Sequence, residues 1–147
     1  MGYTHYWNQI KELPLDEWQL FAADVRLALN SPIIGDGFGE AGTKPTVDDN
    51  EVWFNGTGGT GYETVRIVRI SDDREPSGWQ IKESPDRPHF NFAKTGHKAY
   101  DPIVVDVLIL AEYWFYPLLE VKSDGDWETV KRDRLNLHRL MQERSEE

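Results

Sequence analysis

Positive charge gathers in one window of an otherwise acidic chain. The 147 residues carry a formal net charge of −10, yet residues 87–100 contain no Asp or Glu. This window places Lys94, Thr95, His97 and Lys98 just before a predicted helix. The start of a helix carries partial positive charge and unpaired N–H groups, which suit phosphate or carboxylate. These residues predict a site for an anionic ligand; the alternative is that the lysines are ordinary solvated charges.

The N-terminal run Y-T-H-Y-W supplies aromatic and titratable side chains. On a strand, Tyr3, His5 and Trp7 face the same side. If that side is open, Tyr3 and His5 can stack on a planar ligand or form a hydrogen bond with it. The alternative is a core strand in which a backbone group satisfies the His5 ring.

The glycine-rich stretch N-G-T-G-G-T-G, residues 55–61, is a third candidate. It lacks the Gly-Lys-Ser/Thr ending of a P-loop, and a strand is predicted after it where phosphate-binding and dinucleotide-binding loops need a helix. Asn55 and Gly56 are therefore predicted to lie on a flexible loop that closes over a ligand. A plain hairpin loop is the alternative.

Composition excludes several classes of function. The chain has no cysteine, which removes disulfides, thiol catalysis and thiolate zinc sites, and its histidines lack metal-ligand spacing, so neither metal nor cofactor is predicted. An acidic chain is a poor general nucleic-acid binder. The longest apolar run, residues 103–115, is interrupted by Asp106 and Glu112 and falls short of the roughly 20 residues of a membrane span. Since the N-terminus does not resemble a signal peptide, a cytoplasmic protein without a membrane partner is predicted.

Three helices are predicted to frame these candidates. Residues 14–30 repeat apolar side chains at helical spacing, with acids in the first turn. Asp101 as N-cap and Pro102 in the first turn open the second helix. Its apolar body, residues 103–116, predicts a central buried position. The third helix is expected at about residues 126–142.

Strands complete an α+β pattern. They are predicted at residues 2–8, 51–54, 63–70, 79–82, 89–94 and 118–122. Gly35–Pro45 is expected to be a mobile loop and Glu143–Glu147 a frayed tail. The order predicts a single α+β domain over residues 1–147, with a mainly antiparallel sheet of about four to six strands and three helices packed mostly on one face.

Several short motifs resemble an uncharacterised family of small bacterial and bacteriophage proteins. They are G-Y-T-H-Y-W (2–7), F-N-G (54–56), E-T (63–64), F-x-K-T-x-x-K-x-Y-D (92–101) and S-D-G (123–125). The family pattern has a Cys before the Lys-Thr pair and a Pro before the Tyr-Asp pair, where this chain has Ala93 and Ala99. The resemblance implies a shared fold and a shared site, and it supplies no activity.

The favoured function is a binding protein for a small anionic, nucleotide-type ligand. The phage members of the family imply an anti-defence protein that sequesters a host nucleotide immune signal. One alternative is an enzyme that hydrolyses or modifies such a nucleotide, with His5 or Glu63 as general base and Lys94 stabilising developing charge. Another is an acidic interaction protein, a nucleic-acid mimic that inhibits a basic host defence enzyme. A homo-oligomer is also left open.

Overall fold

The first sheet is built around the N-terminal strand. The computed structural model describes residues 3–70 and 89–135. β1 (Thr4–Gln9) lies in the centre of this sheet, with β6 (His89–Lys94) on one side and β7 (Leu119–Ser123) on the other, both antiparallel to it. Buried and partly exposed side chains alternate along β1, so that His5, Trp7 and Gln9 face the core.

The second sheet is built around β4 (Glu51–Gly56). Its other strands are β2 (Ile34–Gly35), β3 (Thr46–Val47) and β5 (Val65–Val68), all antiparallel to β4. The turn between β4 and β5 contains a short 3-10 helix, η1 (Gly58–Thr60). The two-residue strands β2 and β3 were not predicted, because so short a stretch has no periodicity to read.

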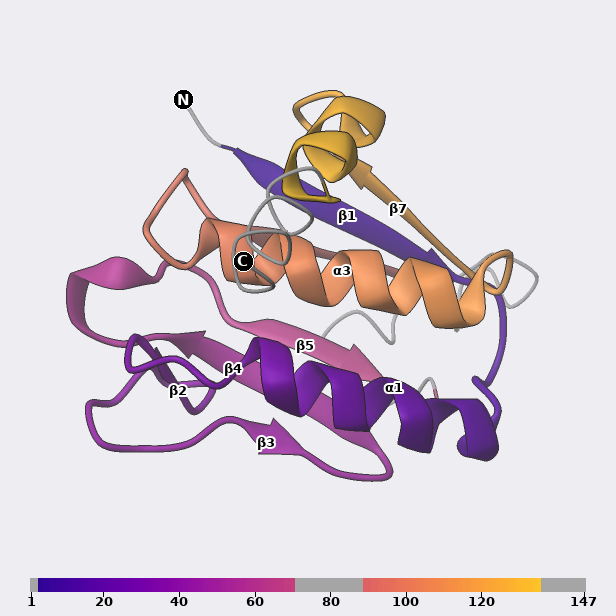
Figure 1. The fold of residues 1–147 in the computed structure, drawn as a ribbon, viewed down its shortest axis with the longest axis horizontal. Coiled ribbons are helices and arrows are strands. Elements are labelled where there is room, and N and C mark those ends of the chain that lie inside the picture. The colour runs from indigo at the N-terminus through magenta and orange to yellow at the C-terminus, as the bar shows by residue number, and fades with distance from the viewer. Residues whose placement is uncertain (1–2, 71–88, 136–147) are drawn as a thin grey trace, which may run out of the picture.

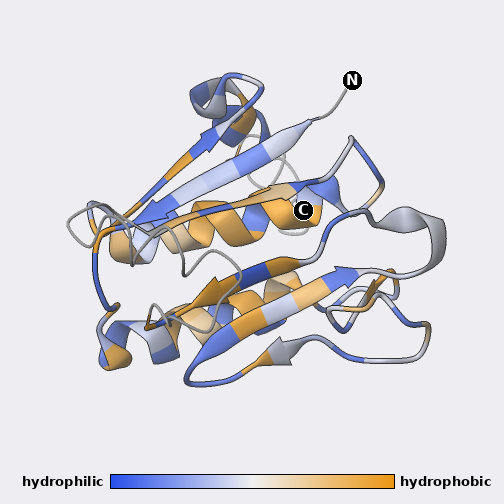
Figure 2. Cartoon of the chain, turned by 180° about the vertical axis from the view of Figure 1, so that it is seen from behind, coloured by the Kyte–Doolittle hydropathy of each residue, from blue (hydrophilic) through white to orange (hydrophobic). Residues whose placement is uncertain are grey.

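Two long helices cover the same face of both sheets. α1 (Leu15–Ala28) lies over the second sheet and α3 (Asp101–Phe115) beside β1 and β7 (Figure 1). From behind, the sheets lie in front of both helices, and α3 is mostly hydrophobic (Figure 2). Residues 127–135 are also helical. Among the described residues, no helix combines the length and apolarity needed to cross a membrane.

One hydrophobic core joins both sheets to both helices. Trp18 and Phe21 of α1 meet Phe115 of α3, with ring centroids 5.1–6.0 Å apart. Val52 and Val65 of the second sheet and residues of β1 and β7 belong to the same buried cluster. The predicted α+β class, with helices on one face, is therefore confirmed, although the strands form two sheets where one was expected.

Several predicted boundaries shift. The predicted mobile loop Gly35–Pro45 begins in β2, and the Asp36 N–H donates a hydrogen bond to Thr43 Oγ1 at 2.9 Å, which ties its two ends together. Its mobility stays a prediction. The strand predicted at residues 79–82, the end of the third helix and the tail Glu143–Glu147 lie outside the described residues.

Candidate functional site

Residues 95–100 link β6 to α3, and their first part folds against the start of β1 (Figure 1). The Thr95 and Gly96 N–H groups both donate to the Tyr3 carbonyl, at 2.9 and 3.1 Å, and the Lys98 N–H donates to the Thr95 carbonyl. Gly96 and His97 have φ values of 57° and 56°, in the left-handed region that non-glycine residues seldom adopt. This turn brings the predicted residues Tyr3, Thr95 and His97 together.

Beneath this turn lies a buried chain of hydrogen bonds that the sequence did not reveal. The His5 ring is fully buried; its Nδ1 lies 2.5 Å from Ser123 Oγ and its Nε2 lies 2.7 Å from Asp101 Oδ1. In a neutral imidazole, Nε2–H donates to the carboxylate and Nδ1 accepts the serine proton. The Thr95 hydroxyl, also fully buried, donates to the same Asp101 oxygen at 2.5 Å. His5 therefore faces the core and is satisfied by side chains, where the sequence analysis considered an open face or a backbone partner.

Asp101 is not the N-cap of α3, contrary to the prediction. The cap position is Tyr100, which makes no side-chain capping bond, and Asp101 is the first helical residue. The Asp101 N–H donates to the Lys98 carbonyl, the Ile103 N–H donates to the Tyr100 carbonyl, and Pro102 has no N–H. The first turn of α3 therefore does not offer the unpaired donors expected for an anion, because the chain itself uses them.

The environment keeps the Asp101 carboxyl ionised. Burial alone would raise its pKa, but hydrogen bonds from His5 and Thr95 hold the pKa below its ordinary value. The Tyr3 hydroxyl responds in the opposite direction: burial, followed by repulsion from Asp101 and Asp124, raises its pKa. Tyr3 is therefore a neutral hydrogen-bonding group across the physiological range.

Aromatic rings cover this network. The Tyr3 and His97 rings are stacked, with centroids 3.8 Å apart and planes 21° apart, and the edge of Tyr3 meets His5 at 5.1 Å. His97 is exposed, so the outer side of this stack is open to solvent. The left-handed turn at His97 accounts for the stack, since it turns the chain back against Tyr3.

The two predicted lysines lie on either side of the turn. Lys94 is half-buried, with its Nζ 5.4 Å from the centroid of the Tyr62 ring, a distance suited to a cation–π contact. Lys98 is exposed. Neither lysine forms a salt bridge within the part of the chain that the structure describes. We call Lys94, His97 and Lys98 the basic corner.

Glu63 joins the two sheets. Its N–H donates to the Lys94 carbonyl at 3.1 Å, and its Oε1 accepts the Lys94 N–H at 2.7 Å. The buried Tyr100 hydroxyl donates to the Glu63 carbonyl at 2.7 Å, and burial is the main reason why the pKa of Tyr100 is raised. The Glu63 carboxylate is thus engaged by backbone beside the basic corner.

Asn55 and Gly56 support the loop that carries Tyr62. The buried Asn55 side chain donates to the Tyr62 carbonyl at 3.0 Å and accepts the Gly56 N–H at 2.7 Å. Gly56 is buried against Gly61, so that a Cβ on Gly56 would lie 2.6 Å from the Gly61 nitrogen. Both residues shape the loop from beneath, and neither presents a group to solvent there.

Gly56→Ala is expected to lower the free energy of unfolding by about 1–3 kcal/mol, as for other overpacked sites, because the Gly61 backbone must shift. Gly59→Ala is the matched control in the same loop, since a Cβ there meets nothing within 4 Å. Urea denaturation followed by circular dichroism measures both. Equal stabilities for the two variants would contradict the close approach of Gly56 and Gly61.

Three residues of the candidate site were missed or misassigned in the sequence analysis. Ser123 belongs to the S-D-G motif, which entered only through the family resemblance, and Asp101 was assigned to capping. Tyr62 had no signal beyond its place after a glycine-rich loop. Within the described ranges 3–70 and 89–135, no group of three His, Cys, Asp or Glu side chains could hold a metal ion.

Comparisons with protein-family models, with curated proteins and with solved structures found no match to this chain. The interpretation of the site therefore depends on the geometry of its own residues.

Proposed function

We propose that this protein binds a small anionic, nucleotide-type ligand at the basic corner. The observation that carries the proposal is that Asp101 and Glu63 accept hydrogen bonds from groups other than the lysine side chains. Asp101 binds His5 and Thr95, and Glu63 binds the Lys94 backbone. The charges of Lys94 and Lys98 are thus left without an acidic partner among the described residues, on a chain with a net charge of −10.

The rings around the basic corner suit the planar part of a nucleotide. The Tyr62 side chain is 50% exposed. The His97 ring stacks on the Tyr3 ring, and the two together form a second aromatic surface. A base can stack on either ring while the lysines bind phosphate as point charges. Thr95 supports such a site from below, because its hydroxyl is committed to Asp101.

The biological role follows from the family resemblance. The G-Y-T-H-Y-W opening and the F-x-K-T-x-x-K-x-Y-D block are similar to those of bacteriophage proteins. A phage protein that holds a nucleotide without turning it over removes a host immune signal from the cytoplasm. We therefore assign this chain the role of a nucleotide sponge in phage anti-defence.

Replacing both Lys94 and Lys98 by alanine is expected to weaken nucleotide binding at least about a hundredfold. Each lysine contributes one charge-assisted hydrogen bond of about 1.5–3 kcal/mol, and about 1.4 kcal/mol is a factor of ten. The measurement is calorimetry against a panel of cyclic and linear nucleotides at two salt concentrations. Stability should hardly change, because neither lysine side chain forms a salt bridge among the described residues.

Lys122→Ala is the control, since Lys122 is exposed on β7 and outside the basic corner. It should bind like the parent. Equal binding by the double variant and the parent would remove the basic corner from the site. Absence of binding by every form, together with salt-dependent capture of a basic host enzyme, would favour the acidic interaction protein.

A second candidate function is hydrolysis, favoured by the order Ser123–His5–Asp101. A serine hydroxyl donating to a histidine that a carboxylate orients is the arrangement of an activated nucleophile. Chromatography of each nucleotide after incubation separates the two functions. Intact recovery supports binding, whereas turnover that Ser123→Ala abolishes, with binding retained, supports the enzyme.

A further inference from the structure

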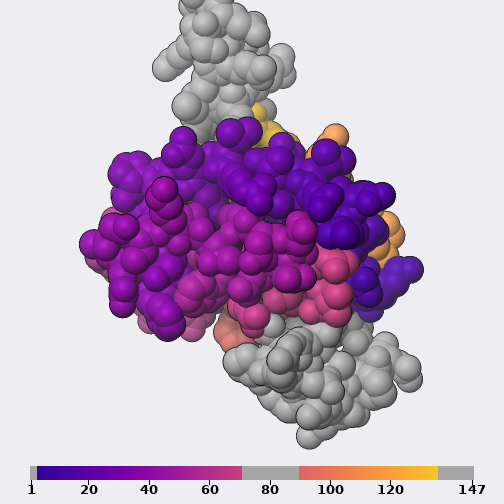
Figure 3. All heavy atoms as spheres, turned by 90° about the horizontal axis from the view of Figure 1, so that it is seen from below, coloured from indigo at the N-terminus to yellow at the C-terminus, as the bar shows by residue number. Residues whose placement is uncertain are grey.

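A hollow lies beside the C-terminal end of α1 and shares no residue with the basic corner. It has a volume of about 580 Å³ and opens between the C-terminal end of α1 and residues 42–47. This volume is within the roughly 300–1,000 Å³ of small-molecule pockets. Seen from below, α1 and the following residues up to 70 form most of the described surface (Figure 3).

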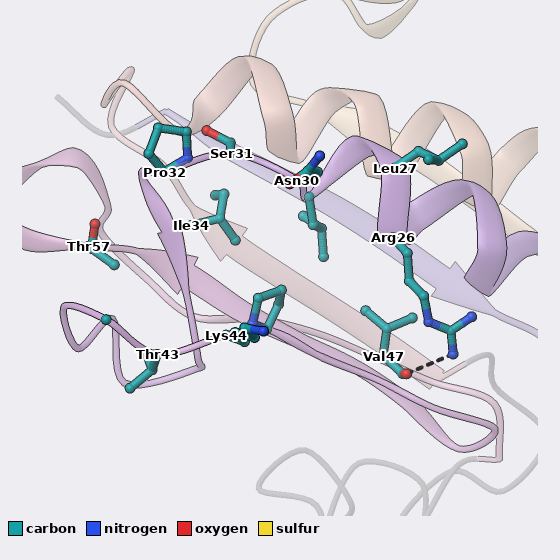
Figure 4. A pocket seen from close by; sticks show the side chains of 13 residues that line it. Arg26, Leu27, Asn30, Ser31, Pro32, Ile34, Thr43, Lys44, Val47 and Thr57 are labelled. Carbon is teal, nitrogen blue, oxygen red and sulfur yellow. Dashed lines mark hydrogen bonds between the residues drawn. The ribbon is translucent and has the colours of Figure 1, made fainter.

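The lining of the hollow combines apolar side chains with polar and charged ones. Leu29 and Ile34 line it and are 3% and 5% exposed. Pro45 and Val47 line it from the facing segment. At one end Arg26 reaches from α1 to the Val47 carbonyl, and Pro32 and Thr57 lie at the other end (Figure 4). An apolar group that enters would be enclosed by side chains from both segments.

The charged residues of the lining are all cationic. Arg26 and Lys44 line the hollow, and no acidic residue does. Arg26 Nη2 donates to the Val47 carbonyl at 3.0 Å. This bond holds the guanidinium group at the edge of the hollow and leaves its other N–H groups for a ligand. Among the described residues, neither cation forms a salt bridge. This is a local reversal of the chain's charge of −10.

The threonine hydroxyl groups of the lining are already engaged, and Ser31 Oγ accepts the Ile33 N–H at 3.4 Å. Thr43 Oγ1 donates to the Glu40 carbonyl and accepts the Asp36 N–H, and Thr57 Oγ1 donates to the Ile33 carbonyl. These bonds hold the walls in place without a ligand. The two cations and the apolar side chains, beside the polar groups of Asn30 and Ser31, are therefore the groups that can recognise a ligand.

We propose that this hollow binds an organic carboxylate with an apolar body. The carboxylate accepts hydrogen bonds from Arg26 and Lys44, and the apolar body packs against Leu29 and Ile34. Both parts are required, because the cations alone are solvated and the apolar lining alone does not discriminate between ligands of similar size. The proposal is independent of the nucleotide site, since the two sites use different residues.

The test is a titration of the isotopically labelled protein by ¹H–¹⁵N NMR with 2-naphthoate, 2-naphthalenemethanol and acetate. The naphthoate carries both features, and each of the other two probes carries one. Saturable shifts are expected for naphthoate at the amides of Leu27, Asn30, Ile34 and Lys44. The neutral alcohol should bind at least about tenfold more weakly, the loss of one charge-assisted hydrogen bond, and acetate should not saturate.

Lys44→Gln tests whether the lysine charge binds the carboxylate. Lys44 is exposed, so the substitution should leave the fold intact, lower naphthoate affinity about tenfold and leave alcohol binding unchanged. Lys11→Gln, an exposed lysine outside the hollow, is the control and should bind like the parent.

Equal affinities for naphthoate and the alcohol, or shifts confined to other residues, would overturn the proposal. The variant with both Lys94 and Lys98 replaced by alanine separates the two sites. It should retain naphthoate binding, and loss of that binding would assign the anion to the basic corner instead.

Discussion

Trp18→Ala is expected to lower the free energy of unfolding by about 3–5 kcal/mol, the usual cost of truncating a buried tryptophan. The Trp18 side chain is fully buried, packs against Phe21 and Phe115, and donates from Nε1 to the Asp48 carbonyl at 2.7 Å. The substitution opens a cavity where α1 meets α3 and leaves that carbonyl without its donor. Urea denaturation followed by circular dichroism measures the loss without depending on tryptophan fluorescence.

Leu27→Ala is the matched control on the same helix. Leu27 is 77% exposed, so its truncation should change stability by about 0.5 kcal/mol or less. A similar denaturation midpoint for Trp18→Ala and the parent would show that α1 does not bury this face.

Asp101→Ala is expected to lower the free energy of unfolding by about 3 kcal/mol. The substitution leaves two buried donors, His5 Nε2–H and the Thr95 hydroxyl, without their acceptor, and each unsatisfied group costs about 1–3 kcal/mol. A residue that only capped α3 would contribute about 0.5–2 kcal/mol. Denaturation of Asp101→Ala, Thr95→Val and the double variant tests the assignment, because contacting residues show non-additive effects. Strict additivity would mean that Asp101 and Thr95 act separately.

The pH dependence of stability gives an independent measurement on Asp101. Its pKa is lowered in the folded state, so the unfolded chain takes up a proton first as pH falls. The stabilisation is therefore present above the ordinary Asp pKa of about 4 and is lost as pH falls through the folded value. The parent should lose stability over this acidic range more steeply than Asp101→Asn. Parallel curves would show that Asp101 is not tied to His5 and Thr95.

These effects bear on function because the buried network supports the basic corner. Thr95 donates its N–H to Tyr3 and its hydroxyl to Asp101, and His97 stacks on Tyr3. Loss of Asp101 therefore loosens the turn that presents His97 and Lys98. We expect Asp101→Asn, the milder variant, to weaken nucleotide binding less than the removal of both lysines. It disturbs the position of His97 and Lys98 but leaves both lysine charges in place.

The sequence by itself determined the helices and the strands that carry the candidates. Side chains on one turn of a helix or one face of a strand have directions set by the local backbone, so periodicity was enough to place Trp18 and Phe21 on the buried face of α1. The largely apolar character of residues 103–110, with Asp106 as the exception, likewise predicted a buried α3. The window of positive charge around Lys94 was equally visible, because it is a local departure from the composition of the chain.

Only the tertiary structure decided what the polar residues do. Ser123 and Asp101 lie 118 and 96 residues from His5 along the chain, and no local pattern records that β1, β7 and the start of α3 converge. Separations of 31 and 21 residues likewise hid the hydrogen bonds from Lys94 to Glu63 and from Arg26 to Val47. A hydrogen bond depends on where two backbones meet after packing, whereas periodicity depends on one backbone alone. For that reason the sequence predicted Asp101 as a helix cap, and packing made it the acceptor for His5 and Thr95.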